Sequence, residues 1–327
     1  MENFNVNINV SEVIKNYDET RVADSATKKK TEFSPKNYLS ARLNPGETEK
    51  TLVIRLLPFS AEETDPFKKV FIHTVKVNKE LSPGGWKTFV CPVHNKMGDK
   101  CPFCEVSSKS RELRFNAGTD AEKKKYGEIE YLNKAKAAYI VRCIERGHEE
   151  DGVKFWLFNE NKQGKGVYDQ IIKIQKRRAE KAKLRGEECN IFDLNNGKDL
   201  ILTITKDINN KTVITVVDDD EKTPLTDDYE KGMSWINDPK KWTDVYTVKN
   251  YDYMVIVING GVPVFDKEQN KYVDQAAKKE AEAKQKEEEL NANLTEQKVD
   301  FAAEISPTTA DNSMGGIIIS DEDDLPF

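Results

Sequence analysis

The stretch Cys91-Pro-Val-His94-Asn-Lys-Met-Gly-Asp-Lys-Cys101-Pro-Phe-Cys104 is the most informative part of this chain. It gathers three cysteines and one histidine, and a second histidine, His73, lies upstream in an apolar segment. A Cys-x-x-Cys pair whose first cysteine precedes proline makes a tight turn, and the backbone N–H groups of such a turn can point at thiolate sulfurs. Thiolate and imidazole are the ligands that zinc prefers, so the stretch predicts a zinc site.

The sequence leaves the fourth zinc ligand open. His94 would complete a compact Cys-x-x-His and Cys-x-x-Cys arrangement, which the spacing alone favours. His73 would instead come from a predicted strand at residues 70–75 and would tie the metal loop to the body of the fold. Either choice gives four nitrogen and sulfur ligands, which predicts one closed, structural zinc ion rather than a catalytic one.

The other interpretation of the cysteines is a set of free thiols or a redox Cys-x-x-Cys, which would need a following helix within a βαβ pattern. Cys143 and Cys189 lie far from the cluster and from each other, and we interpret them as apolar packing residues. Three clustered cysteines among five make a poor disulfide framework, and no N-terminal apolar segment indicates secretion. We therefore expect a reduced protein of the cytoplasm, or of the host cell cytoplasm if the protein is viral.

Charge is unevenly distributed along the 327 residues, of which 33% are charged. The formal net charge is −6 and the mean hydropathy is −0.70, which leaves a modest core. Residues 171–186 nevertheless carry seven bases against one acid, and the last seven residues are four acids followed by Leu-Pro-Phe. Separated signs allow a basic surface for nucleic acid despite the negative sum. No apolar stretch approaches the roughly twenty residues that span a bilayer, so we expect no membrane contact.

Short apolar runs with helices between them predict an elaborated small β-barrel. Its strands are predicted at 51–57, 70–77 and 86–90, and in two hairpins at 137–158 and 199–217. Residues 105–131 and the basic segment are predicted helices, whereas 245–259 fits helix and strand equally well. The expected domains are an N-terminal arm (1–50), a barrel core (51–265) with a zinc subdomain at about 68–110, and a charged linker with an acidic tail (266–327).

Aromatic and basic residues alternate on these strands, as is typical of proteins that bind single-stranded nucleic acid. Bases stack on aromatic rings for about 1–3 kcal/mol each with little preference, while Lys and Arg follow the phosphates. The alternative for each of these residues is an ordinary structural position, because strand aromatics often lie in the core and lysines often lie on the solvated surface. The candidate DNA-binding residues are Arg55, Trp86, Lys134, Lys136, Tyr139, Arg142, Phe155, and, on the basic helix, Lys173, Lys176, Arg177 and Arg178.

The sequence offers little material for catalysis. It contains no Gly-x-x-x-x-Gly-Lys-Ser/Thr phosphate loop, no Gly-x-Ser-x-Gly elbow and no His-Glu-x-x-His motif. Two of the three histidines lie near the predicted metal site, which leaves few candidates for a general base. We expect a binding protein and not an enzyme, with a zinc-dependent nucleic-acid enzyme as the weaker alternative.

Taken in order, the motifs resemble the zinc-containing, helix-destabilising single-stranded DNA-binding proteins of large tailed bacteriophages, the gene-32 type. The specific matches are Val53-Ile54-Arg55-Leu56-Leu57-Pro58, His73, Trp86 shortly before Cys91, and the Cys91, Cys101-Pro-x-Cys104 spacing. Weaker matches follow at Lys134-x-Lys136-x-x-Tyr139, Asp151–Phe155 and Phe192–Gly197. The resemblance covers roughly residues 50–206 and the acidic tail.

This resemblance implies an OB-fold barrel in an α+β, mainly β chain, with an inserted zinc subdomain, helical insertions and a disordered acidic tail. It implies the metal ligands His73, Cys91, Cys101 and Cys104, with His94 as the alternative to His73. It also places Arg55, Trp86, Lys134, Lys136, Tyr139 and Phe155 along a DNA cleft. The implied function is the coating of single-stranded DNA in phage replication, recombination and repair.

The resemblance further implies partners other than DNA. The cluster Lys28, Lys29 and Lys30 resembles a basic patch through which family members associate along the strand, although it lies farther from the start of the chain. The tip resembles that of bacterial single-stranded DNA-binding proteins, which recruit replication and recombination proteins; its residues are Asp321, Glu322, Asp323, Asp324, Leu325, Pro326 and Phe327. The alternative function is a zinc-ribbon adaptor in phage transcription or replication assembly.

Overall fold

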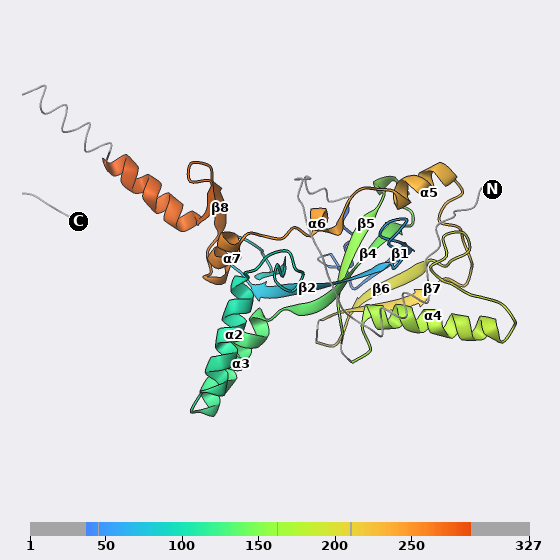
Figure 1. Cartoon of the computed structure of the whole chain (residues 1–327), viewed down its shortest axis with the longest axis horizontal. Coiled ribbons are helices and arrows are strands. Elements are labelled where there is room, and N and C mark those ends of the chain that lie inside the picture. Colours follow the sequence, from blue (N-terminus) through green and yellow to red (C-terminus); the bar gives the residue numbers. More distant parts are fainter. Residues whose placement is uncertain (1–36, 45, 162, 210, 289–327) are drawn as a thin grey trace, which may run out of the picture. The chain divides into compact units, whose positions relative to one another are not determined.

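The computed structural model describes residues 37–44, 46–161, 163–209 and 211–288 (Figure 1). The chain divides into two units, residues 1–274 and 275–327, which we describe separately. In the second unit, residues 275–288 are helical, and Lys284 pairs with Glu280 one turn away at 2.8 Å.

A seven-stranded antiparallel sheet is the framework of the first unit. Its spatial order is β3-β2-β4-β1-β6-β7, and β5 also pairs with β4. The strands are β1 (Glu49–Leu57), β2 (Phe67–Lys76), β3 (Trp86–Val90), β4 (Lys136–Glu145), β5 (Lys154–Asn159), β6 (Leu200–Lys206) and β7 (Thr212–Asp218).

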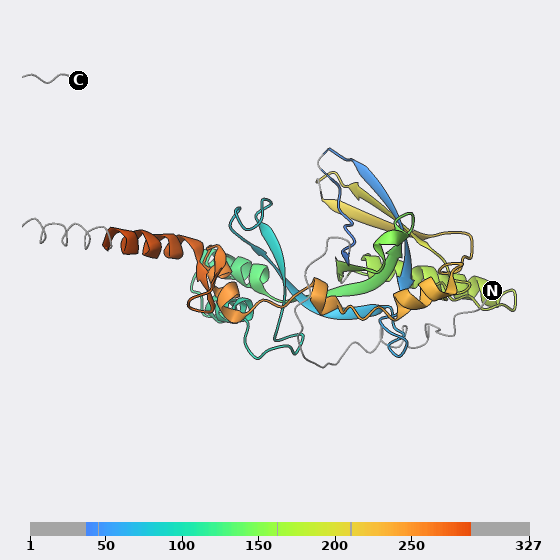
Figure 2. The ribbon, with the colours of Figure 1, turned by 90° about the horizontal axis from the view of Figure 1, so that it is seen from above.

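Strand β4 curls the sheet because three strands pair with it. Its first half pairs with β2, with Lys136 opposite Ile72, and its second half pairs with β1, with Arg142 opposite Leu57. Strand β5 lies along its other edge. Figure 2 shows β2 and β4 as long, curved strands. The expected class is thereby confirmed as a curled antiparallel half-barrel with inserted helices and a Cys/His cluster.

Helices fill the longer connections between strands. Helices α2 (Pro102–Phe115) and α3 (Asp120–Asn133) form a hairpin between β3 and β4, as the charged segment predicted. Helix α3 begins where the Thr119 side chain accepts from the Glu122 N–H and Glu122 accepts from the Thr119 N–H, a capping box. A 3-10 turn, η2 (Glu149–Asp151), joins β4 to β5, and α4 (Val167–Lys183) joins β5 to β6.

The main core lies between the concave sheet and α4. Helix α4 turns Val167, Ile171 and Ile174 inward and its bases outward, which is the pattern of an amphipathic surface helix. Leu39 and Ala41 also belong to this core. The described part of the expected N-terminal arm is therefore packed against the barrel.

After β7, the structure resolves a segment that the sequence left open and adds several short elements. The ambiguous segment contains helix α7 (Tyr251–Ile258), which the Asn250 side chain caps by accepting from the Tyr253 N–H at 2.9 Å. The other late elements are α5 (Tyr229–Ile236), α6 (Trp242–Val245), β8 (Pro263–Asp266) and β9 (Lys271–Asp274). The expected boundary at residue 266 falls inside the β8–β9 hairpin. Helix α7 and Tyr272, which lies beyond this boundary, pack on the Cys91–Phe103 core cluster.

Candidate metal centre and nucleic-acid interface

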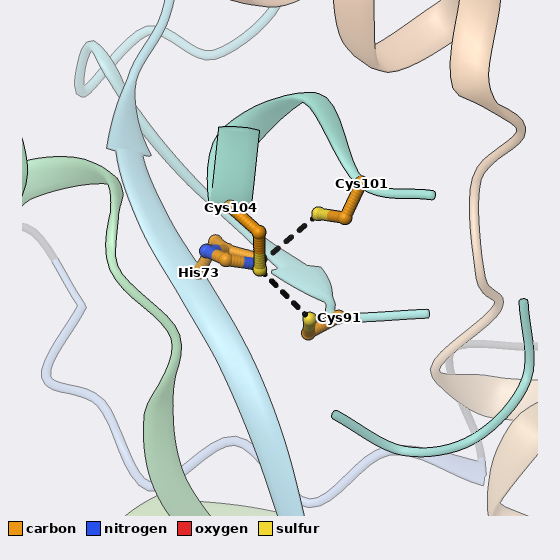
Figure 3. Close-up of side chains that lie close together, drawn as sticks. All are labelled: His73, Cys91, Cys101 and Cys104. Carbon is orange, nitrogen blue, oxygen red and sulfur yellow. Dashed lines mark hydrogen bonds between the residues drawn. The ribbon is translucent and has the colours of Figure 1, made fainter. Parts of the chain in front are cut away.

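Four side chains converge between β2, the end of β3 and the start of α2 (Figure 3). The ligand atoms of His73, Cys91, Cys101 and Cys104 all lie within 4.8 Å of one another. The Nε2 atom of His73 is 3.3 Å from the Cys101 sulfur, and the Cys91 and Cys104 sulfurs are 3.5 Å apart. The group is buried except for Cys104, which is half-buried. These residues could hold a metal ion.

The loop that carries Cys91 is held by main-chain and amide contacts. The His94 N–H donates to the Cys91 sulfur at 3.4 Å, the contact expected of a tight turn around a thiolate. The Asn95 amide accepts from the Phe71 N–H at 2.9 Å and donates to the Phe71 oxygen at 2.7 Å. Asn95 therefore fixes the loop to β2 beside His73.

A hydrogen bond on the far side of the ring orients His73. Its Nδ1 atom lies 2.7 Å from the main-chain oxygen of Asn133, the last residue of α3. A proton on Nδ1 donated to this oxygen leaves Nε2 free to face the sulfurs. Metal-bound histidines carry this kind of second hydrogen bond, so the surroundings of His73 suit a ligand.

The crowding of three sulfurs controls protonation in the cluster. Hydrogen bonds to Cys101, and then to Cys91, raise the pKa of Cys104, because they favour the protonated thiol beside these sulfurs. Burial lowers the pKa of His73, but hydrogen bonds to Cys101 and Cys91 outweigh burial and raise this pKa to about 9. A divalent cation bound among the sulfurs would offset their negative charge. Three sulfurs and one imidazole form a donor set that suits zinc.

His94 occupies the exposed rim of the same cluster. Its Nδ1 atom is 3.3 Å from the Cys91 sulfur and 3.5 Å from the Cys104 sulfur. The side chain is exposed, whereas His73 is fully buried. The set of four mutually close ligand atoms contains His73 and not His94.

The side of β2 that faces away from the metal cluster carries polar and aromatic residues. Lys76 pairs with Trp86 and Thr74 pairs with Thr88, so these four share one face of β2 and β3. Successive strand residues alternate sides, so His73 points to the opposite face. Trp86 is 44% exposed, and the Lys76 Nζ atom lies 5.8 Å from its ring centroid.

A second aromatic residue adjoins this face. Tyr131 on α3 is 58% exposed, and the Nζ atoms of Lys134 and Lys136 lie 5.0 and 4.3 Å from its ring centroid. Lys136 pairs with Ile72, which lies on the same side of β2 as Thr74. We call the combined surface the strand face; its residues are Thr74, Lys76, Trp86, Thr88, Tyr131, Lys134 and Lys136.

Tyr131, Lys76 and the two threonines were not among the residues predicted to bind DNA. Tyr131 lies in a charged helical segment, where no strand alternation marks it. Only the register of β2 against β3 and the end of α3 bring these residues together. The available signal was the short spacing from Tyr131 to Lys134 and Lys136.

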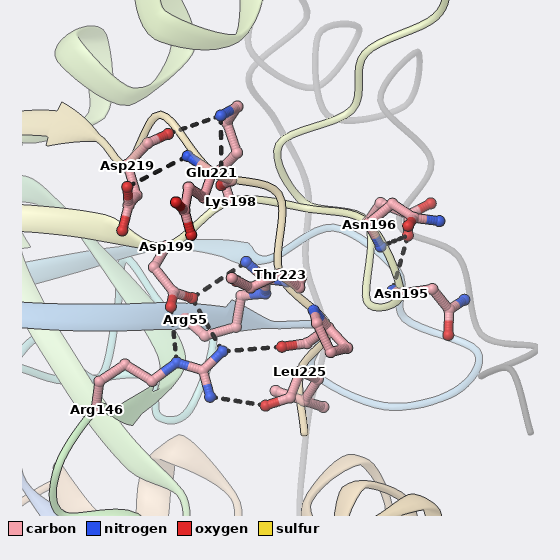
Figure 4. Close-up of polar contacts among 12 residues, drawn as sticks. Arg55, Arg146, Asn195, Asn196, Lys198, Asp199, Asp219, Glu221, Thr223 and Leu225 are labelled. Carbon is pink, nitrogen blue, oxygen red and sulfur yellow. Dashed lines mark hydrogen bonds and ion pairs between the residues drawn. The ribbon is translucent and has the colours of Figure 1, made fainter. Parts of the chain in front are cut away.

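Arg55, a predicted DNA contact, is instead fully buried (Figure 4). Its Nη1 atom donates to Asp199 at 3.1 Å, and its Nη2 atom donates to the Thr223 oxygen. Arg146 binds the same Asp199 carboxylate at 2.9 and 3.1 Å. Burial lowers the pKa of Arg55 to about 10, although Asp199 opposes this change. Arg55 therefore joins β1 to β6 and to the segment after β7.

Three other predicted DNA contacts are also buried within the fold. Arg142 donates to the main-chain oxygens of Pro58 at 3.0 Å and Trp235 at 2.7 Å. Tyr139 is buried and stacks on Tyr168 with ring centroids 4.1 Å apart, and Phe155 is fully buried. These side chains offer almost no surface to a ligand, so the structure gives them a different role from the expected one.

The predicted bases of α4 lie at the other end of the sheet, because α4 packs beside β7 and the strand face lies on β2 and β3. Arg177 and Arg178 both bind Asp218, and Arg178 also binds Asp220 at 2.8 Å. Lys173 donates to the Gly164 oxygen at 2.5 Å, and Lys176 is exposed. The structure does not bring these bases together with Trp86.

The basic cluster Lys28–Lys30 and the acidic tip Asp321–Phe327 lie outside the described residues. Within the described part of the chain, no helix combines the length and the apolar composition that a membrane span requires.

A family of known proteins is similar to this chain over most of its length. A scan against protein families matches residues 49–313 to the family described as gp32 DNA binding protein like. The match begins with β1 and includes the metal cluster, the strand face and the later elements of the first unit. A search of curated proteins finds no match to the chain.

Proposed function

Because the chain belongs to the gp32-like family of DNA-binding proteins, we propose that it binds single-stranded DNA on the strand face, without sequence preference. The observation that carries the proposal is the pairing of exposed rings with lysines: Trp86 with Lys76, and Tyr131 with Lys134 and Lys136. Proteins that bind single strands combine stacking rings with cations along the phosphates. Each stacked base contributes about 1–3 kcal/mol whatever its identity.

The arrangement of the strand face suits a single strand rather than a duplex. Rings that take part in stacking need a base face, and the faces of paired bases are covered by their neighbours in a duplex. The hydroxyls of Thr74 and Thr88 lie 3.4 Å apart between the two aromatic sites and can bind phosphate or sugar oxygens. Protein contacts to the backbone position the strand but read no sequence.

The metal in this proposal is one structural zinc ion held by His73, Cys91, Cys101 and Cys104. Bound zinc supplies folding energy to a closed site and leaves no open position for chemistry. The residues of the chain do the positioning: His73 holds β2, and its hydrogen bond to Asn133 holds the junction from which Lys134 and Lys136 extend. The metal cluster therefore supports the strand face from behind.

We further propose that the protein acts by binding, not by catalysis, and coats single-stranded DNA during phage replication, recombination and repair. The family supports the DNA-binding part of this role. The proposed recruitment of partners by Asp321–Phe327 and self-association through Lys28–Lys30 rest on sequence composition. The four acids Asp321–Asp324 suit the recruitment role, because their charge can attract basic partner surfaces and competes with phosphate for cations.

A fluorescence titration with oligo-dT tests the proposed function. Stacking of a base on Trp86 should quench part of the tryptophan emission, because the other tryptophans are buried or half-buried. The affinity should fall as salt rises, with a logarithmic slope of about −0.7 for each phosphate contacted. Full-length protein that shows neither quenching nor salt-dependent binding would refute the proposal.

A further inference from the structure

The hairpin of α2 and α3 ends in an exposed aromatic residue. Phe115, the last residue of α2, is 71% exposed, and the neighbouring Leu113 is also exposed. The Arg114 guanidinium lies 5.1 Å from the Phe115 ring centroid. Figure 1 shows the hairpin projecting from the sheet. We call residues 113–118 the hairpin tip.

The part of the hairpin around this tip has a positive charge balance. Residues 109–125 contain six bases and three acids, and three of the bases are the consecutive Lys123, Lys124 and Lys125. All three of these lysines are exposed. The tip therefore combines an apolar ring with cations, which suits a phosphate polymer better than an acidic or purely apolar partner.

The hairpin tip and the strand face belong to one continuous element. Helix α3 starts next to the tip and ends at Asn133, directly before Lys134. A helix of 14 residues spans about 21 Å, which corresponds to roughly six nucleotides at the spacing of a duplex strand. A strand that leaves the strand face along α3 would reach Phe115 within this distance.

Contacts between the two helices hold the tip in place. Arg114 pairs with the Glu130 carboxylate at 2.9 Å, and the Ser107 hydroxyl donates to the main-chain oxygen of Glu130 at 3.2 Å. Gly127 leaves room for the Arg114 side chain, since a Cβ atom there would lie 3.2 Å from the Arg114 Cδ atom. The ring is thus presented on a preorganised element, which lowers the entropic cost of binding.

We propose that Phe115 stacks on an unpaired base at the junction between single-stranded and duplex DNA, so that the hairpin tip engages the end of the duplex. Apolar side chains in other DNA-binding proteins insert between base steps in this manner. The three exposed lysines Lys123, Lys124 and Lys125 would bind the phosphates that flank the junction. This inference rests on the proposed function, because the strand face must hold the single strand that leads to the tip.

The test compares two probes in the full-length protein: oligo-dT alone, and the same oligo-dT joined to a hairpin duplex. A fluorescent adenine analogue at the junction reports loss of stacking. Phe115→Ala should lower the preference for the junction probe by about fivefold or more and should abolish the change in analogue emission. Its affinity for oligo-dT alone should be unchanged, because this oligo-dT is chosen short enough to end at the tip, where only the joined duplex meets Phe115. Phe115→Trp should restore both signals.

Leu184→Ala is the matched control, because Leu184, the C-cap residue that follows α4, is apolar, 88% exposed and far from α3 in the chain. It should leave the junction preference intact, and circular dichroism should show that all variants fold. Retention of the preference by Phe115→Ala, or failure of Phe115→Trp to restore it, would overturn the inference. Loss of oligo-dT binding by the unmodified protein would instead overturn the proposed function.

Discussion

The Nδ1 atom of His73 lies 2.7 Å from the main-chain oxygen of Asn133, the residue that precedes Lys134. The buried His73 ring therefore faces the cysteines with Nε2 and the segment that leads into Lys134 with Nδ1. Since β2 carries His73 and Thr74 on opposite sides, the metal cluster and the strand face share the same strand. The metal cluster and the strand face can therefore be mutated separately, although both depend on the position of β2.

The two candidate histidine ligands differ in their expected effect on metal content. His73→Ala should lose the metal and lower the melting temperature, because a buried ligand with a fixed tautomer is removed. His94→Ala should keep about one zinc ion per chain. Elemental analysis and thermal unfolding of both variants measure these outcomes. A zinc-loaded His73→Ala protein beside a zinc-free His94→Ala protein would reverse the assignment.

Trp86→Ala should weaken oligo-dT binding by about 1–3 kcal/mol, the contribution of one stacked base. The side chain is 44% exposed, so we expect little change in the melting temperature. Trp86→Phe is the matched control and should keep most of the affinity, because it keeps a ring. Isothermal titration gives the affinities, and equal affinity of Trp86→Ala and the unmodified protein would remove Trp86 from the interface.

Replacement of Lys134 and Lys136 by alanine should reduce the salt dependence of binding. If each lysine contacts one phosphate, the double variant should lower the magnitude of the logarithmic salt slope by about 1.4. The control is a double alanine variant of Lys181 and Lys183, which are exposed on α4 at the other end of the sheet. Binding is measured over a series of salt concentrations. An unchanged slope in the first variant would exclude both lysines from phosphate contact.

Arg55→Ala should act on stability rather than on DNA binding. Removal of a fully buried partner of Asp199 should lower the free energy of unfolding by about 3–5 kcal/mol. Lys68→Ala, which breaks the exposed pair with Glu63, should change it by less than about 1 kcal/mol. Chemical denaturation measures both. Wild-type stability combined with lost DNA affinity in Arg55→Ala would return Arg55 to the interface.

Local patterns predicted much of the fold because they are set by neighbouring residues. The apolar run of β1, the two hairpins and the cysteine spacing each depend on a few adjacent side chains. Helix α7 was ambiguous because its β-branched residues favour a strand, and the Asn250 cap and the packing of Met254 decide for helix. Tertiary contacts determined that choice.

The DNA-binding residues were harder to predict, because a sequence does not show which side of a curled sheet faces solvent. Arg55 and Arg142 have the charge of a phosphate contact, but their partners are Asp199 and main-chain oxygens that come from distant segments. Conversely, the register of β2 with β3 places Lys76 beside Trp86. Burial and register are non-local properties, so the sequence predicted a surface of rings and lysines but only some of the residues of the proposed strand face.

Ultraviolet cross-linking of oligo-dT to the full-length protein, followed by mass spectrometry of the linked peptides, distinguishes binding on the strand face from binding elsewhere. Binding on the strand face predicts that the cross-linked residues include Trp86 and Tyr131, at a yield that falls with added salt. Cross-links confined to α4 (Val167–Lys183), or the absence of any cross-link to β3 and α3, would contradict the account.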